Sequence, residues 1–184
     1  MSNKVAMLIA DGTEPIEALA PIDILRRGGV DAQLISIMGP KVVLAHNIIV
    51  EAEGTINDID LSGYDMIVVP GGSVGVENLG ACEPVRRALA QFMQDDRFVA
   101  SICAGPMILA DLGLLVGRTA TCYPGCEGGF PQGAYVEGPT VVVDGNLITA
   151  SGPGVALDFG VALLRALKGD ALSDGVASDM LMER

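Results

Sequence analysis

Short continuous runs of apolar residues alternate along the chain with segments in which apolar residues recur at helical spacing. The apolar runs lie at 5–10, 32–37, 66–69 and 98–102, with a shorter one at 48–52. Such runs are typical of strands buried on both faces of a parallel sheet. Helical patterns lie at 15–27, 84–94, 155–167 and 172–180, and a hairpin with an Asp-Gly turn is predicted at 141–148. This order predicts an α/β fold, a doubly wound and mostly parallel sheet with helices on both faces and one β-hairpin.

Glycine-rich or polar turns follow several of the predicted strands. They lie at 11–17, 70–72, 103–105 and 151–154. Ligands of open α/β sheets bind beyond the carboxyl ends of the strands, so these turns are expected to form the site. Segment 71–75 lacks the Gly-Lys-Ser/Thr of a P-loop and does not match the dinucleotide pattern G-x-G-x-x-G, so the sequence predicts no nucleotide cofactor.

Cys103 stands where the apolar run 98–102 ends and a helical segment, 107–112, begins. Ser101 and Gly105 occupy the places that small residues hold in a G-x-S-x-G nucleophile elbow, where a strand turns sharply into a helix and exposes the nucleophile. A thiol at a helix N-terminus faces unpaired N–H groups, which lower its pKa. The pattern predicts a reactive thiolate at Cys103; the alternative is a buried cysteine that only fills space in the core.

The composition predicts one domain spanning residues 1–184. Half of the residues are apolar, and no repeat or linker interrupts them. Eleven Lys and Arg against 23 Asp and Glu give a formal charge of −12, which repels polyanions and argues against a nucleic-acid partner. No apolar stretch has the length of a membrane span or of a signal-peptide core, so we expect a cytoplasmic protein with no membrane partner.

The four cysteines, at 82, 103, 122 and 126, are expected to be free thiols in that compartment. The spacing of Cys122 and Cys126 is not a recognised zinc spacing. No second pair and no histidine cluster completes four ligands, so no metal is expected.

Five motifs in this order resemble the ThiJ/PfpI superfamily, in particular its small dimeric branch, which includes a parkinsonism-associated human protein. The motifs lie at 11–17, 23–29, 64–72, 102–106 and 152–159, and so extend over nearly the whole chain. The resemblance implies a flavodoxin-like fold, a function that requires no metal or nucleotide, and usually a homodimer with helix 15–27 at its interface.

The resemblance also implies roles for particular residues. Cys103 is the implied nucleophile, and Glu17 is the acid that lies against its sulfur. Because two adjacent negative charges are costly, a thiolate at Cys103 is expected to hold Glu17 protonated. Glu14 is expected to be a helix-start carboxylate rather than a catalyst. The oxyanion and substrate site is expected to involve Gly71, Gly72, Ala104 and Tyr123, with the backbone N–H groups of Gly72 and Ala104 as the oxyanion donors.

Two positions bear on how far the resemblance extends. Tyr123 stands where many relatives have a histidine beside the cysteine. Peptidase or amidase chemistry, which needs an imidazole, therefore loses support, and the proton shuttle is left to Glu17, Tyr123 or water. Ser151 stands where close relatives can have arginine.

Two basic residues are candidate contributors at a dimer seam, Arg27 and the sole histidine, His46. For each, the alternative is an ordinary solvent-exposed group. Cys122 adjoins Tyr123 and is a candidate resolving thiol for oxidised Cys103, whereas Cys82 and Cys126 are expected to be structural or surface thiols.

The activity that the resemblance implies is a glyoxalase or deglycase acting on a small carbonyl metabolite. Cys103 would add to a 2-oxoaldehyde such as methylglyoxal, and Glu17 would move a proton between adjacent carbons to give lactate, in an overall hydro-lyase or hydrolase reaction. The main alternative is an oxidative-stress sensor or chaperone that works through oxidation of Cys103 to sulfinic acid. Isonitrile hydration is a minor alternative.

Overall fold

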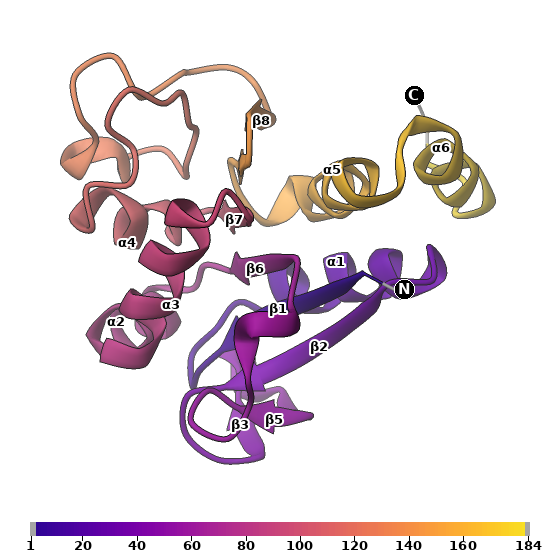
Figure 1. Cartoon of the computed structure of the whole chain (residues 1–184), viewed down its shortest axis with the longest axis horizontal. Helices are drawn as coiled ribbons and strands as arrows, with labels where there is room; N and C mark the ends of the chain where they lie inside the picture. The colour runs from indigo at the N-terminus through magenta and orange to yellow at the C-terminus, as the bar shows by residue number, and fades with distance from the viewer. Residues whose placement is uncertain (1–2, 183–184) are drawn as a thin grey trace.

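A seven-stranded sheet forms the centre of the molecule in the computed structural model, which describes residues 3–182 (Figure 1). The strand order is β5-β2-β1-β6-β7-β9-β8, and every neighbouring pair is parallel except the β8–β9 hairpin. These strands are β1 (Lys4–Ile9), β2 (Asp31–Ser36), β5 (Gly54–Thr55), β6 (Met66–Val69), β7 (Phe98–Ile102), β8 (Val141–Asp144) and β9 (Leu147–Ala150). The predicted α/β fold with a mostly parallel sheet and one hairpin is confirmed.

Helices cover both faces of this sheet, as Figure 1 shows. One face carries α1 (Pro15–Arg27), α5 (Ala156–Lys168) and α6 (Asp170–Asp179), and the other carries α2 (Ser73–Ala81), α3 (Glu83–Gln94) and α4 (Pro106–Asp111). Each face has its own buried apolar cluster, since alternate side chains of the central strands point to opposite sides. The continuous apolar runs of the sequence are therefore explained by burial on both faces.

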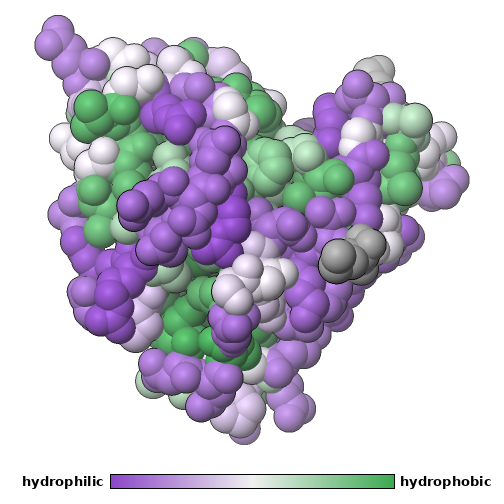
Figure 2. All heavy atoms as spheres, viewed as in Figure 1, coloured by the Kyte–Doolittle hydropathy of each residue, from purple (hydrophilic) through white to green (hydrophobic). Residues whose placement is uncertain are grey.

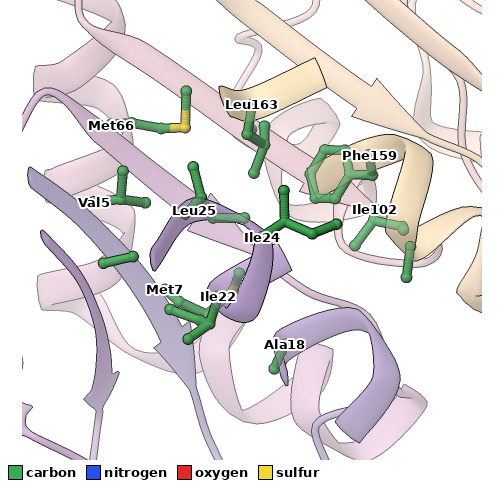
Figure 3. Packing of buried hydrophobic residues seen from close by; sticks show 14 of the residues in the cluster. Val5, Met7, Ala18, Ile22, Ile24, Leu25, Met66, Ile102, Phe159 and Leu163 are labelled. Carbon is green, nitrogen blue, oxygen red and sulfur yellow. The ribbon is translucent and has the colours of Figure 1, made fainter. Parts of the chain in front are cut away.

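Helix α1 packs against α5 on one face of the sheet. Figure 3 shows Ile24 of α1 beside Phe159 of α5, with Val5 and Met7 of β1 on the other side of α1. Gly160 of α5 makes this approach possible. A Cβ atom there would lie 2.8 Å from Ile24 Cδ1 and 3.0 Å from the Cα atom of Pro21.

Substitution of Gly160 by alanine is expected to lower the free energy of unfolding by about 1 to 3 kcal/mol, because the added methyl meets the backbone at Pro21 as well as a side chain. Gly175 of α6 is the matched control, since a Cβ atom there has no neighbour within 4 Å. Gly175→Ala is expected to stabilise the protein by up to about 1 kcal/mol. Urea denaturation measures both, and equal effects of the two substitutions would contradict this packing.

Several elements differ from the sequence prediction, among them the short strand β5 (Gly54–Thr55), which was not predicted. Helix α2 begins directly after Gly72, so segment 71–75 is the start of a helix as well as a turn. Gly75 and Gly80 weaken the helical pattern there, but Gly75 is needed because a Cβ atom would lie 2.6 Å from Thr13 Cα. The predicted strand at 48–52 is β4 (Ile49–Glu51), which lies outside the central sheet and pairs antiparallel with β3 (Lys41–Val43), a strand that the pattern did not predict.

Polar residues cover most of the face shown in Figure 2, with hydrophobic residues in separate patches between them. Within residues 3–182, no helix has both the length and the apolar character needed to cross a membrane.

Candidate active site

A strained turn places Cys103 at the carboxyl end of β7. Its φ is 63°, in the left-handed region that costs a side-chain-bearing residue about 1–3 kcal/mol and that clusters at functional sites. The hydroxyl of Ser101 donates to the carbonyl oxygen of Val69 at 3.0 Å. A Cβ atom at Gly105 would lie 2.4 Å from Ser101 Oγ and 2.7 Å from that same carbonyl oxygen. The small residues that flank Cys103 in the sequence are therefore required by close packing, as in a nucleophile elbow.

Glu17 comes from the first turn of α1 and is 0% exposed. Its Oε2 accepts a hydrogen bond from the Gly71 N–H at 2.7 Å, and its carboxyl group is hydrogen-bonded to the Cys103 thiol. Oε1 is buried and makes no hydrogen bond of standard geometry with a described residue. Gly71 lies beside both Glu17 and Cys103, where there is no room for a side chain. A Cβ atom there would lie 2.6 Å from Glu17 Oε2 and 3.1 Å from Cys103 Sγ.

Burial dominates the electrostatics of this pair. It raises the pKa of Glu17 to about 7, against smaller lowering effects of the hydrogen bonds from Cys103 and Gly71. Burial, the charge of Glu17 and the hydrogen bond to Glu17 raise the pKa of Cys103 to about 12. Between these two pKa values the pair holds one proton, which the two groups share.

The sequence-based expectation of a lowered thiol pKa at Cys103 is wrong, and the geometry gives the reason. Helix α4 begins at Pro106, which has no N–H, and the Gly105 N–H already donates to the Ile102 carbonyl oxygen at 3.0 Å. The Ala104 N–H donates to the sulfur and lowers the pKa of Cys103, but burial and Glu17 outweigh it. The raised pKa of Glu17 is in the expected direction.

A cavity of about 320 Å³ opens beside the pair. Tyr123 lines it and is 50% exposed. The full lining is Glu14, Glu17, Gly72, Ser73, Cys103, Ala104, Tyr123, Cys126 and Pro153. Gly71, which the sequence placed in the oxyanion or substrate site, is not part of this lining, because its N–H is directed to Glu17.

The two residues predicted to contribute to a dimer interface, Arg27 and His46, lie at different distances from the cavity. Arg27 is at the far end of α1, roughly 15 Å from Glu17 along the helix, and its Nε donates to Asp23 at 2.7 Å. The Nε2 atom of His46 lies 3.5 Å from an oxygen of Glu14, which lines the cavity. His46 thus lies next to a residue of the cavity lining without lining the cavity itself, a proximity hidden by the sequence separation.

The model of the DJ-1/PfpI family matches residues 3–166. The chain belongs to the DJ-1/PfpI family.

Other members of the DJ-1/PfpI family match along nearly the whole chain. "Protein DJ-1 homolog B" of Arabidopsis thaliana is 36% identical over 183 residues, which are 98% of this chain and 42% of that protein, so the chain spans less than half of this relative's length. "Glutathione-independent glyoxalase DJ-1" of Schizosaccharomyces pombe is 30% identical over 172 residues, 88% of this chain and 89% of that protein. The structure of oxidized Toxoplasma gondii DJ-1 has a TM-score of 0.95 at 30% identity and covers 100% of both chains.

The second thiol in the cavity of this DJ-1/PfpI member is Cys126, not Cys122. Cys122 is 1% exposed and does not line the cavity, so its predicted role as a resolving thiol stays a prediction. A turn explains the difference, since the Cys126 N–H donates to the Tyr123 carbonyl oxygen at 2.9 Å and Gly125 has a φ of 93°. The sequence Tyr-Pro-Gly-Cys carries the Pro and Gly that a type II turn favours, and this signal could have placed Cys126 beside Tyr123.

The part of the chain that the structure describes has no cluster of metal-binding side chains. No three His, Cys, Asp or Glu side chains gather there in a group that could hold a metal ion.

Proposed function

We propose that this protein is a cysteine-dependent, cofactor-independent glyoxalase that converts small 2-oxoaldehydes such as methylglyoxal into 2-hydroxy acids such as lactate. The observation that carries the proposal is the hydrogen-bonded pair of Glu17 and Cys103 beside a cavity of about 320 Å³. A cavity of this volume suits a small metabolite. The similarity to the Schizosaccharomyces pombe relative named a glutathione-independent glyoxalase supports the same chemistry.

In the first step the Cys103 sulfur adds to the aldehyde carbon, C1. The proton shared by the pair passes through Glu17 to the aldehyde oxygen, so the product is a neutral hemithioacetal and Glu17 is left as a carboxylate. Gly72 and Ala104 line the cavity, and their backbone N–H groups would stabilise the charge that develops on this oxygen.

In the second step the Glu17 carboxylate removes the hydrogen from C1, giving an enediolate. Glu17 then returns this proton to C2, while the proton on the C1 oxygen passes to the C2 oxygen through Tyr123 or water. The product is a lactoyl thioester of Cys103, in which C1 is oxidised and C2 is reduced by the same two electrons. A carboxyl group with a pKa of about 7 suits both proton transfers at neutral pH.

In the third step water hydrolyses the thioester. The Glu17 carboxylate takes one proton from the water as its oxygen attacks C1, and Cys103 leaves as a thiolate. The thiolate and Glu17 again share one proton, so the pair is restored. The sum of the three steps is methylglyoxal plus water giving lactate and a proton, and the reaction uses no external oxidant or reductant.

The pH dependence of lactate formation tests the proposal. The full chain is incubated with methylglyoxal, without glutathione, between about pH 5 and pH 9, and lactate is measured. Because a second proton on the pair leaves no base, the rate is expected to fall roughly tenfold per pH unit below about pH 7, the pKa of Glu17. Absence of lactate at every pH, or an acid limb at the ordinary pKa of a glutamate, would contradict the proposed roles.

A second candidate function is a sensor of oxidative stress that works through oxidation of Cys103. The observation that favours it is the oxidized state of the Toxoplasma gondii structure, which matches this fold with a TM-score of 0.95. Cys103 is partly exposed at the cavity, where a peroxide can reach it. Intact methylglyoxal in the assay, together with oxidation of Cys103 by dilute peroxide, would favour the sensor over the glyoxalase.

We also propose that the protein is a homodimer through the start of α1 and the β3–β4 sheet. Exposed apolar side chains gather on these segments, which are held together by a hydrogen bond from the Gly12 N–H to the Val43 carbonyl oxygen. Ile49→Asp is expected to convert a dimer into a monomer, as measured by analytical ultracentrifugation. Val143→Asp on the distant strand β8 is the matched control, because Val143 is equally exposed. A monomeric wild type would contradict this part of the proposal.

A further inference from the structure

Two thiols face one cavity in this protein. Cys103 and Cys126 both line the space of about 320 Å³ beside Glu17, and both are partly exposed. The other two thiols do not line the cavity, since Cys122 is buried and Cys82 packs against the apolar cluster on the opposite face of the sheet. The proposed glyoxalase mechanism makes no use of Cys126.

The backbone ties these two cysteines together. The Tyr123 N–H donates to the carbonyl oxygen of Cys103 itself at 2.9 Å, and the Cys126 N–H donates to the Tyr123 carbonyl oxygen at 2.9 Å. The turn that carries Cys126 is therefore anchored on the elbow that carries Cys103. Gly125, with a φ of 93°, gives this turn a residue that adopts such a conformation without strain.

We propose that Cys126 is the resolving thiol of Cys103, so that mild oxidation of the site produces an intramolecular Cys103–Cys126 disulfide. A hydroperoxide first transfers one oxygen to the Cys103 sulfur, giving a sulfenic acid and releasing water, or an alcohol from an organic hydroperoxide. The Cys126 sulfur then attacks the Cys103 sulfur. The S–O bond breaks, water leaves with the proton of Cys126, and the S–S bond forms.

The disulfide has two consequences for the site. It occupies the Cys103 sulfur and crosses the cavity, so the nucleophile is blocked, and a thiol reductant restores it. It also diverts the sulfenic acid from further oxidation to sulfinic acid, which thiols do not reverse. Burial and the charge of Glu127 raise the pKa of Cys126, so resolution is expected to become faster as the pH rises.

The test is oxidation of the full chain with one molar equivalent of hydrogen peroxide, followed by peptide mass mapping without reductant. In the wild type we expect the peptides of Cys103 and Cys126 to be linked within one chain, and dithiothreitol to release them. In Cys126→Ser we expect no linked peptide and a Cys103 peptide that carries two added oxygen atoms and resists dithiothreitol. Cys122→Ser and Cys82→Ser are the matched controls and should form the same disulfide as the wild type.

Three results would overturn the proposal. These are sulfinic acid at Cys103 forming as fast in the wild type as in Cys126→Ser, a Cys103–Cys122 disulfide, or a disulfide between two chains. The readout is the mass of peptides and needs no enzymatic activity, so the outcome is independent of whether the protein is a glyoxalase.

Discussion

Replacement of Cys103 by serine is expected to reduce lactate formation from methylglyoxal to the rate of the protein-free reaction. A serine hydroxyl holds its proton more tightly than a thiol, and the Glu17 carboxyl, with a pKa of about 7, is too weak a base to remove it. Serine is close to cysteine in size and can bond to Glu17, so the fold is expected to survive. Lactate is measured in a glutathione-free assay at about pH 8, above the pKa of Glu17.

Cys82→Ser is the control for this substitution, because Cys82 is partly buried on the face of the sheet opposite α1. It should keep the wild-type rate. Lactate formation by Cys103→Ser at a rate comparable with that of Cys82→Ser would remove Cys103 from the mechanism.

Glu17→Gln is the second substitution with a large expected effect, and it changes activity and stability in opposite directions. Glutamine cannot carry a proton between C1 and C2, so the rate of lactate formation is expected to fall by roughly 10²- to 10⁴-fold. The amide oxygen of glutamine can still accept the Gly71 N–H bond that holds Glu17 in place. Asp23→Asn, an exposed change on the same helix, should leave the rate unaltered.

The same variant is expected to be more stable than the wild type above neutral pH. The pKa of Glu17 rises from 4.5 to about 7 on folding, so the native protein binds this proton more tightly than the unfolded chain. Between these values the unfolded chain holds fewer protons, and the stability of the wild type therefore falls as the pH rises. The difference of about 2.5 pKa units corresponds to roughly 3 kcal/mol of stability, which is fully present below about pH 4.5 and is lost as the pH rises to about 7.

Urea denaturation at about pH 5 and pH 8 measures this effect, with Glu17→Gln as the reference that lacks the titrating group. The wild type should lose stability relative to Glu17→Gln between the two pH values. A constant difference between the two proteins would show that Glu17 is not a buried carboxyl with a raised pKa.

The sequence was sufficient for most of the central sheet and for the sharp turn at Cys103. Strands buried on both faces leave continuous apolar runs, and β6 (Met66–Val69) and β7 (Phe98–Ile102) have the bounds that those runs predict. Ser101 and Gly105 indicated the elbow, because a sharp turn of the chain at Cys103 permits only small neighbours. The contact of Glu17 with Cys103 came from the resemblance to a family, since 86 positions separate them in the sequence.

What the sequence did not predict depends on packing between distant segments. The sequence predicted a lowered pKa for Cys103, but the pKa is raised. Burial and the contact with Glu17 depend on the tertiary structure, and they outweigh the lowering effect of the neighbouring Ala104 N–H. Helix α2 was missed because its glycines weaken the helical pattern, although Gly75 is needed there for close contact with Thr13 of the β1–α1 loop. Cys126 was set aside because spacing alone does not show that the Tyr123 turn reverses toward Cys103.

The number of lactate molecules formed per protein molecule, with methylglyoxal in large excess and no other thiol present, tests the proposed function most directly. A glyoxalase in which Glu17 and Cys103 are restored in every cycle predicts many turnovers and an amount of lactate equal to the methylglyoxal consumed. Consumption that stops at one equivalent, with a stable adduct on Cys103 and no lactate, would show that the protein captures aldehydes without converting them and would contradict the proposed function.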